Sequence, residues 1–245
     1  MMLEPVTRHS PSPAVPAVEV RNLCVSYGDV QALHGVSLSV GQAEFIGIAG
    51  ANGAGKSTLL RAVSGALKPR SGTIQVFGAQ TRGWPTHRLA RAGLVHVPEG
   101  RAIFSGLSVE DNLLSGAVGR SSARLGDVLE IFPHLKNKMR QAAGSLSGGE
   151  QQMVAIGRGL MSKPDLLMID ELSLGLAPKI TVELYEKLVE YGRGRRCSMI
   201  LVDQNLDLLR RFTGRIVILR SGRIAVEQDS KNFIDNESAI DAYLG

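Results

Sequence analysis

Short apolar runs of the kind that form strands alternate along this chain with longer helical patterns. Strands are predicted at residues 18–25, 32–40, 44–49, 73–76, 93–97, 166–169 and 198–202, and a hairpin with a Ser221-Gly222 turn at residues 215–219 and 222–227. Helices are predicted at residues 56–64, 86–92, 125–132, 180–191, 206–212 and 237–244, and Ser108 is a suitable N-cap for another. Strands and helices in this order indicate an α/β fold.

Residues 100–160 differ from the rest of the chain, because helical patterns follow one another there without a strand. We therefore expect an inserted helical subdomain in this part of the chain. The first 16 residues contain four prolines and indicate a flexible leader. The chain is thus predicted to consist of a leader, residues 1–16, and a single domain, residues 17–245.

Composition narrows the class of protein. A chain of 245 residues with 44% hydrophobic content suits one large α/β domain, and the 4% aromatic content means that aliphatic side chains must fill its core. The net charge of +5 is modest and is more typical of an ordinary surface with phosphate-binding residues than of a nucleic-acid-binding one. No apolar run approaches the ~18 residues of a membrane-spanning helix, and no secretory signal is recognisable at the N-terminus.

The cysteines and histidines give no sign of a metal centre. Cys24 and Cys197 lie far apart and match no metal-binding spacing, and the five histidines are scattered. We expect two reduced cysteines in a cytosolic protein.

The strongest chemical signal is a glycine-rich loop between the apolar run at residues 44–49 and a predicted helix. Its sequence fits G-x-x-x-x-G-K-[ST] without a gap. Glycines let backbone N–H groups close around phosphate oxygens, Lys56 can reach the β- and γ-phosphates, and Ser57 can place its hydroxyl on Mg²⁺. The predicted phosphate-binding residues are Gly50, Ala51, Asn52, Gly53, Ala54, Gly55, Lys56, Ser57 and Thr58.

Two carboxylates follow the apolar strand predicted at residues 166–169. In a parallel sheet this strand would place Asp170 at its carboxyl end, beside the glycine loop, where it can bind Mg²⁺ directly or through water. Glu171 comes next and can polarise an attacking water. Together with the glycine loop, this pair predicts nucleotide hydrolysis.

A second glycine-serine element precedes another helix. It comprises Leu146, Ser147, Gly148, Gly149, Glu150 and Gln151. Its glycines expose backbone donors, its serine adds a hydroxyl, and the dipole of the following helix favours an anion. With this element the chain resembles the ATP-binding subunits of ABC transporters over about residues 17–245, with the motifs in the expected order.

The resemblance implies an α/β P-loop NTPase core of the ABC type, with an N-terminal antiparallel β subdomain and an inserted helical subdomain at about residues 86–160. It implies that the second glycine element, hereafter the signature element (residues 146–151), contacts ATP held by an opposite subunit. ATP would then hold two such domains together head to tail, and hydrolysis would release them.

The resemblance also implies roles for single residues. Tyr27 is placed where an aromatic ring stacks on adenine, and residues 173–176 match the loop that crosses the dimer interface. Glu99, with Ser57 and Asp170, is implied at the Mg²⁺ site, in a loop that links this site to a transmembrane partner. Gln204 is implied to act beside Glu171, at the position where a γ-phosphate contact is made.

Three positions depart from the general family pattern. Glu99 replaces the usual Gln, Leu172 replaces Pro, and Gln204 replaces a His. We expect Glu99 to add negative charge near the γ-phosphate and Leu172 to change loop stiffness more than chemistry. Gln204 can donate an amide hydrogen bond, but unlike an imidazolium it carries no charge.

Two of these departures, Glu99 and Gln204, lie in the motifs P-E-G-R and D-Q-N. Together with S-L-G-L-A-P at residues 173–178 and the ending at residues 241–245, these motifs resemble the LivF-type subunit of branched-chain amino-acid importers. That subfamily implies a second ATPase of the LivG type, two permeases and, indirectly, a solute-binding protein, with the motor on the cytoplasmic face of the plasma membrane. Importers of urea, short amides or aromatic acids use similar motors and remain alternatives. A homodimer of the isolated chain is also possible.

Two other classes are weighed against this interpretation. ABC ATPases that act on nucleic acid or ribosomes usually carry two motor domains, zinc modules or long coiled coils, and the basic residues 193–196 are more typical of a solvated turn. A P-loop GTPase would need the guanine-binding motif N-K-x-D, but residues 137–140 place Arg140 where an Asp must accept the base's hydrogen bonds. A small-molecule kinase would leave the signature element without a purpose.

Overall fold

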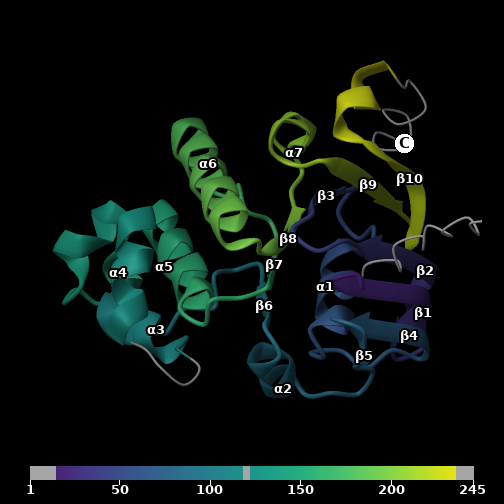
Figure 1. Cartoon of the computed structure of the whole chain (residues 1–245), viewed down its shortest axis with the longest axis horizontal. Helices are drawn as coiled ribbons and strands as arrows, with labels where there is room; N and C mark the ends of the chain where they lie inside the picture. Colours follow the sequence, from purple (N-terminus) through teal and green to yellow (C-terminus); the bar gives the residue numbers. More distant parts are fainter. Residues whose placement is uncertain (1–14, 118–121, 236–245) are drawn as a thin grey trace, which may run out of the picture.

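The computed structural model describes residues 15–117 and 122–235, which form two β-sheets and a lobe of helices (Figure 1). The first sheet is antiparallel, with strand order β2-β1-β4-β5. Gly28, in the predicted turn between the first two strands, has a φ of 57°, which glycine adopts without strain. The strands are β1 Val18–Tyr27, β2 Val30–Val40, β4 Ser71–Val76 and β5 Ala79–Gln80. An N-terminal antiparallel sheet is therefore present, as expected.

The second sheet has the order β10-β9-β3-β8-β7-β6, and all neighbours in it pair in parallel except the β9–β10 hairpin. Its strands are β3 Phe45–Ala49, β6 Leu94–Val97, β7 Leu166–Ile169, β8 Ser198–Val202, β9 Arg215–Arg220 and β10 Arg223–Asp229. The predicted hairpin at residues 215–227 is confirmed. The predicted α/β fold is confirmed as well.

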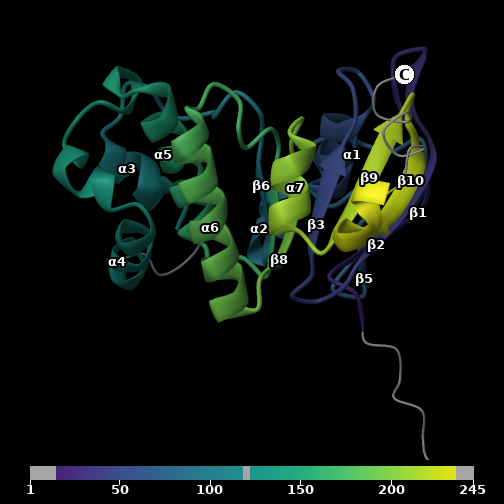
Figure 2. The ribbon, with the colours of Figure 1, turned by 90° about the horizontal axis from the view of Figure 1, so that it is seen from above.

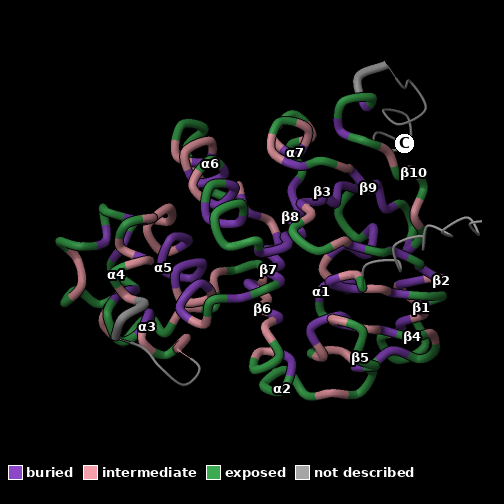
Figure 3. The backbone as a smooth tube through the Cα atoms, viewed as in Figure 1, coloured by how far each residue is buried: buried purple, intermediate pink, exposed green. Residues whose placement is uncertain are grey.

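The central strands are apolar on both faces, as buried parallel strands require. In β3, Ile46 and Ile48 face a core shared with the antiparallel sheet, whereas Phe45 and Ala49 face a core shared with the helices. Side chains of a strand alternate between the two faces, so a short run of five apolar-type residues serves both cores. Figure 3 shows this part of the backbone as a nearly continuous buried stretch.

Helices cover both faces of the core sheet: α1 and α2 contribute to the core shared with the antiparallel sheet, whereas α5, α6 and α7 contribute to the core on the opposite face. Figures 1 and 2 both separate a lobe of α3, α4 and α5 from the two sheets, with α6 between this lobe and α7. The helices are α1 Lys56–Val63, α2 Thr86–Arg91, α3 Val109–Ser115, α4 Ser122–Ile131, α5 Gly148–Leu160, α6 Pro178–Arg195 and α7 Leu206–Phe212. Short 3₁₀ turns are η1 Pro133–Lys138, η2 Ala143–Ser145 and η3 Ser230–Asp235. No helix within the described segments is both long and apolar enough to cross a bilayer.

Some boundaries differ from the sequence expectation. Residues 94–97, inside the expected insert of residues 86–160, form β6 and pair with β7 in the core sheet, so the run of helices without a core strand begins after Val97. The basic residues 193–196 are exposed, but they form the last turn and C-cap of α6 instead of a separate turn. The helix predicted at residues 237–244 and residues 1–14 of the predicted leader lie outside the described residues.

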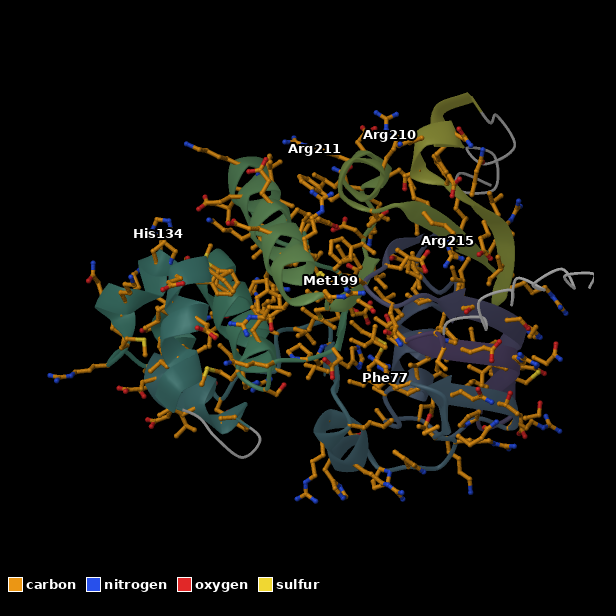
Figure 4. All side chains as sticks on the ribbon, in the orientation of Figure 1. Phe77, His134, Met199, Arg210, Arg211 and Arg215 are labelled. Carbon is orange, nitrogen blue, oxygen red and sulfur yellow. The ribbon has the colours of Figure 1, made fainter. Side chains whose placement is uncertain are left out.

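Arg215 in β9 links the two sheets through its side chain (Figure 4). Its Nε donates to Glu44 at 2.9 Å, its Nη2 donates to the backbone carbonyl of Ser39 in β2 at 2.6 Å, and its Nη1 pairs with Glu227 in β10. The Arg215 side chain is 18% exposed, so these charge-assisted bonds are partly shielded from water. In contrast, Figure 4 shows Arg210 and Arg211 at the outer edge of α7.

Close packing of the lobe depends on glycine at the end of α3. A Cβ added at Gly116 would lie 1.9 Å from the backbone carbonyl oxygen of Arg158 in α5. No side chain fits there without moving one of the two helices. Gly126 in α4 offers the opposite case, because nothing lies within 4 Å of an added Cβ.

We expect Gly116→Ala to lower the free energy of unfolding by about 1–3 kcal/mol, since it overpacks the contact between α3 and α5. The matched control Gly126→Ala should raise it by about 0.5–1 kcal/mol, because alanine restricts the unfolded chain more than glycine does. Urea unfolding followed by circular dichroism measures both. Equal stability of the two variants would contradict the packing described here.

Candidate functional site

The carboxyl ends of four parallel strands meet at one edge of the core sheet. β3 leads into the glycine loop, β7 into Asp170 and Glu171, and β8 into Asp203 and Gln204, while the loop after β6 carries Glu99. Ligands in such sheets bind outside these ends. A pocket of about 390 Å³ opens here, lined by Asn52, Gly53, Gly55, Lys56, Ser57, Thr58, Glu99, Glu171, Leu174 and Gln204.

The glycine loop has a backbone that only glycine accepts. Gly50 has a φ of 148°, and a Cβ there would lie 2.3 Å from the backbone oxygen of Leu219. The loop closes around the Lys56 ammonium, which is buried and donates to the carbonyls of Gly50 at 2.7 Å and Ala51 at 3.1 Å. Lys56 also begins α1, so a fixed positive charge and the positive end of a helix dipole face the pocket together.

Asp170 is a buried carboxylate whose oxygens lack hydrogen-bond partners. It is 1% exposed, and neither of its carboxylate oxygens has a hydrogen-bond partner. Burial raises the pKa of this carboxyl, and the charges of Glu99 and Glu171 raise it further. The Ser57 hydroxyl and Arg61 lower the pKa, although Ser57 lies near without completing a hydrogen bond of normal geometry.

Such an unpaired buried carboxylate fits a cation. No group of three or more His, Cys, Asp or Glu side chains within the described segments is arranged to hold a metal alone. A divalent ion here would therefore need the Ser57 hydroxyl, water and phosphate oxygens besides Asp170. That donor set suits Mg²⁺, which binds through one or two carboxylates and keeps phosphate and water ligands.

Gln204 fixes the neighbouring carboxylate. Its Nε2 donates to Oε1 of Glu171 and to Oδ1 of Asn52, at 3.1 Å in both cases. Glu171 has a φ of 52°, a conformation that is uncommon for a residue with a side chain. The amide of Gln204 thus links the glycine loop to the carboxylate that follows β7.

Leu172 makes a contact that a proline could not make. Its backbone N–H donates to the carbonyl of Val202 at 3.3 Å, and its side chain is fully buried. Because proline has no N–H, this bond between the loop after β7 and strand β8 requires another residue. The departure at position 172 therefore adds an anchor to the loop that carries Glu171.

Asp203 organises the same region, and the sequence reasoning missed it. It is 1% exposed and accepts hydrogen bonds from Ser173 N at 3.0 Å, Ser173 Oγ at 2.7 Å, Asn205 N at 2.9 Å and the Tyr185 hydroxyl at 2.9 Å. Burial, and next the charge of Asp203, raise the pKa of Tyr185. An available signal was the position of Asp203 directly after an apolar strand, as with Asp170.

The signature element is shaped by helix capping. Ser147 is the N-cap of α5 and forms a capping box with Glu150, whose Oε2 accepts from Ser147 N at 3.0 Å. Glu150 also pairs with Lys138, which lowers its pKa. Gln151 donates to the carbonyls of Gly144 at 3.2 Å and Leu146 at 3.0 Å. Gly148 and Gly149 open the first helical turn, which leaves their backbone donors unobstructed by side chains of their own.

The predicted site residues fall into two groups. Tyr27 lies beside the glycine loop, 44% exposed, with its hydroxyl 3.4 Å from Oγ1 of Thr58, and Glu99 lines the pocket. The residues of the signature element do not line this pocket. The pocket therefore gathers one part of the predicted machinery, whereas the signature element lies outside it.

Comparisons with known proteins identify the family of this chain. The profile of the ABC transporter family matches residues 33–173. The high-affinity branched-chain amino acid transport ATP-binding protein BraG of Pseudomonas aeruginosa is 44% identical over 223 residues, which cover 89% of this chain and 95% of BraG. The probable branched-chain amino acid transport ATP-binding protein LivF of Archaeoglobus fulgidus is 29% identical, over 88% of this chain and 93% of LivF.

A crystal structure of a nucleotide-free ATP-binding cassette from an ABC transporter has the same fold. It superposes with a TM-score of 0.84 at 24% identity, over 94% of this chain and 99% of that one. The family match spans more than half of the chain, and a relative with 44% identity covers nearly all of it. The chain belongs to the ABC transporter family and is one of its ATP-binding, ATP-hydrolysing domains.

Proposed function

We propose that this chain is the motor subunit of an ABC importer for branched-chain amino acids. The observation that carries the proposal is a nucleotide pocket that unites Lys56, Glu171 and Gln204 while the signature element lies outside it. BraG and LivF, the similar proteins named above, are described as branched-chain amino acid transport proteins, which supports the solute class. Importers of urea, short amides or aromatic acids are the alternatives, because no pocket residue would meet the solute.

The pocket supports a hydrolytic mechanism. Lys56 and the loop amides bind the phosphates, Tyr27 stacks on the base, and the Glu171 carboxylate accepts a proton from the attacking water. Gln204 holds Glu171 in place through its amide. Mg²⁺, held by Ser57 and Asp170 with Glu99 beside them, would neutralise phosphate charge in the transition state. Asp203, at the end of β8, holds the loop of residues 171–175 through its two hydrogen bonds from Ser173.

A second ATPase completes each site. The signature element does not line the nucleotide pocket of this chain, so it would contact ATP held by a partner. In turn, the partner's signature element would contact the ATP bound to this chain. Pseudomonas aeruginosa BraF and BraG are both named as high-affinity branched-chain amino acid transport ATP-binding proteins, and they are 28% and 44% identical to this chain. Two such proteins in one organism support a pair of unequal subunits, of which this chain is the LivF-type member. A homodimer of the isolated chain is the alternative arrangement.

A groove between the core and the helical lobe supports permease docking. It has a volume of about 370 Å³, its lining residue Phe104 is 52% exposed, and Leu107, which follows Phe104 in the sequence, is 44% exposed. Its occupant would be a short helix of a permease at the cytoplasmic membrane face, and residues 98–160 would be the lobe that moves with it. The groove is lined by Ala90, Val95, His96, Val97, Ala102, Phe104, Ser115, Gly116, Ala155, Arg158, Gly159 and Ser162.

Glu171→Gln should bind Mg·ATP with nearly unchanged affinity and lose about 10²- to 10⁴-fold in turnover, because the amide cannot accept the proton of water. It should also trap a closed complex with the partner ATPase. Calorimetry and steady-state ATPase assays measure the two effects, and Lys56→Ala, which loses the phosphate contact, is the control that should fail to bind. Normal turnover of the Glu171→Gln complex would remove this residue from the role of base.

Gln204 gives a second prediction. Since its amide cannot carry charge, we expect weak ATPase activity from the isolated chain and roughly tenfold higher activity when it is paired with the second ATPase. Gln204→His should raise the activity of the isolated chain, and Gln204→Ala should lower it. An isolated wild-type chain as fast as the assembled complex would contradict this role.

The solute is tested with the assembled transporter in proteoliposomes and its own binding protein. Leucine, isoleucine and valine should each stimulate ATP hydrolysis and be taken up, whereas urea, acetamide and benzoate should do neither. The Glu171→Gln complex controls for leakage. Stimulation by urea or benzoate alone would leave the proposed importer function standing and would contradict the proposed solute class.

A further inference from the structure

Arg101 occupies a strained turn. The N–H of Ala102 donates to the carbonyl of Gly100 at 2.7 Å, which closes a three-residue turn with Arg101 at its centre. Gly100, Arg101 and Ala102 have φ values of 81°, 65° and 46°. A γ-turn with a positive central φ is rare and strained, and only Gly100 adopts such a conformation readily. The surrounding contacts must therefore hold this turn.

The side chain of Arg101 supplies such contacts. Its Nη1 donates to Oε1 of Gln151 in α5 at 3.0 Å. Its Nη2 lies close to two glycines. A Cβ added at Gly148 would lie 2.8 Å from this nitrogen, and a Cβ added at Gly175 would lie 3.3 Å from it. The guanidinium thus fills the space left by two glycines, one at the start of α5 and one in the loop after β7.

These contacts join segments with different roles. Glu99, two residues before Arg101, and Leu174, next to Gly175, both line the nucleotide pocket. Gly148 and Gln151 belong to the signature element, which lies outside that pocket. One guanidinium therefore touches the loops of the chain's own nucleotide site and the element that would meet the partner's nucleotide.

Helix stability does not account for this placement. A cation is favourable near the C-terminus of a helix and unfavourable near its N-terminus, yet Arg101 lies at the N-terminal turn of α5. Gln151 connects Arg101 to the segment before the signature glycines, because its Nε2 also donates to the carbonyls of Gly144 and Leu146. The planar guanidinium fork can hold Gln151 and the two glycine segments at once, which a lysine ammonium cannot do.

We propose that Arg101 is a positioning residue that transmits the occupancy of the chain's own nucleotide pocket to its signature element. The inference rests on the proposed function, since it needs a signature that serves a partner's site. Nucleotide in the pocket shifts the loops that carry Glu99 and Leu174, the strained turn moves with them, and the guanidinium moves the start of α5. Each site thereby senses whether the other is filled.

Hydrogen exchange of the full chain, diluted until it is monomeric, tests the proposal. In the wild type, saturating Mg·AMP-PNP should change exchange in residues 144–151 by about fivefold or more, a typical coupling. Arg101→Ala should bind the nucleotide within about twofold of the wild-type affinity, and its signature should respond less than about 1.5-fold. Arg101→Lys should give an intermediate response, because it keeps charge but not the fork.

Two further variants separate the guanidinium from local loosening. Arg101→Gly relaxes the turn and removes the side chain, so it should lose the response and be at least as stable as Arg101→Ala. Lys138→Ala breaks the ion pair with Glu150 on the other side of the signature element, and its nucleotide response should persist. Thermal melting confirms that each variant is folded before exchange is compared.

The outcomes separate this inference from the proposed function. A wild-type chain that binds nucleotide without any change in residues 144–151 would overturn the inference alone, as would a full response in Arg101→Ala or Arg101→Gly. Loss of nucleotide binding in Arg101→Ala would place Arg101 in the pocket and also overturn it. A wild-type chain that does not bind Mg·AMP-PNP would instead refute the ATPase function.

Discussion

Parallel pairing of β3, β8, β7 and β6 is the constraint on which the site depends. Parallel strands place their carboxyl ends at one edge, so four segments that lie far apart in the sequence deliver the glycine loop, Gln204, Glu171 and Glu99 to one pocket. The apolar side chains on both faces of these strands bury the sheet between two cores. A slip of one residue in a strand would exchange its faces and move its terminal polar residue away from the pocket.

Two aspartates at strand ends differ in the number of hydrogen bonds that they accept. Asp170 and Asp203 follow neighbouring strands and are each 1% exposed. Asp203 accepts four hydrogen bonds, so its burial is compensated and it fixes the surrounding loops. Asp170 has no such partner, and its raised pKa reflects that cost. An uncompensated buried charge persists where a ligand supplies the missing partner.

Local sequence was sufficient for the parts of the site that depend on backbone chemistry. A loop rich in glycine, a serine that caps a helix and an acid after an apolar strand each carry their reason within a few residues. Contacts between distant segments could not be predicted in this way. The bond from Tyr185 to Asp203, the place of β6 in the core sheet and the positive φ of Arg101 depend on tertiary packing, which propensities do not encode.

The separation of pocket and signature within one chain has an energetic consequence. A nucleotide can favour a closed pair only by contacts that exist in the closed state, and in the proposed pair those contacts would belong to the signature of the other subunit. Closure then depends on how well α5 is positioned as well as on how tightly ATP binds. A contact such as that of Arg101 with Gln151 acts on this second quantity, so it can alter the cooperation of two sites without touching either nucleotide.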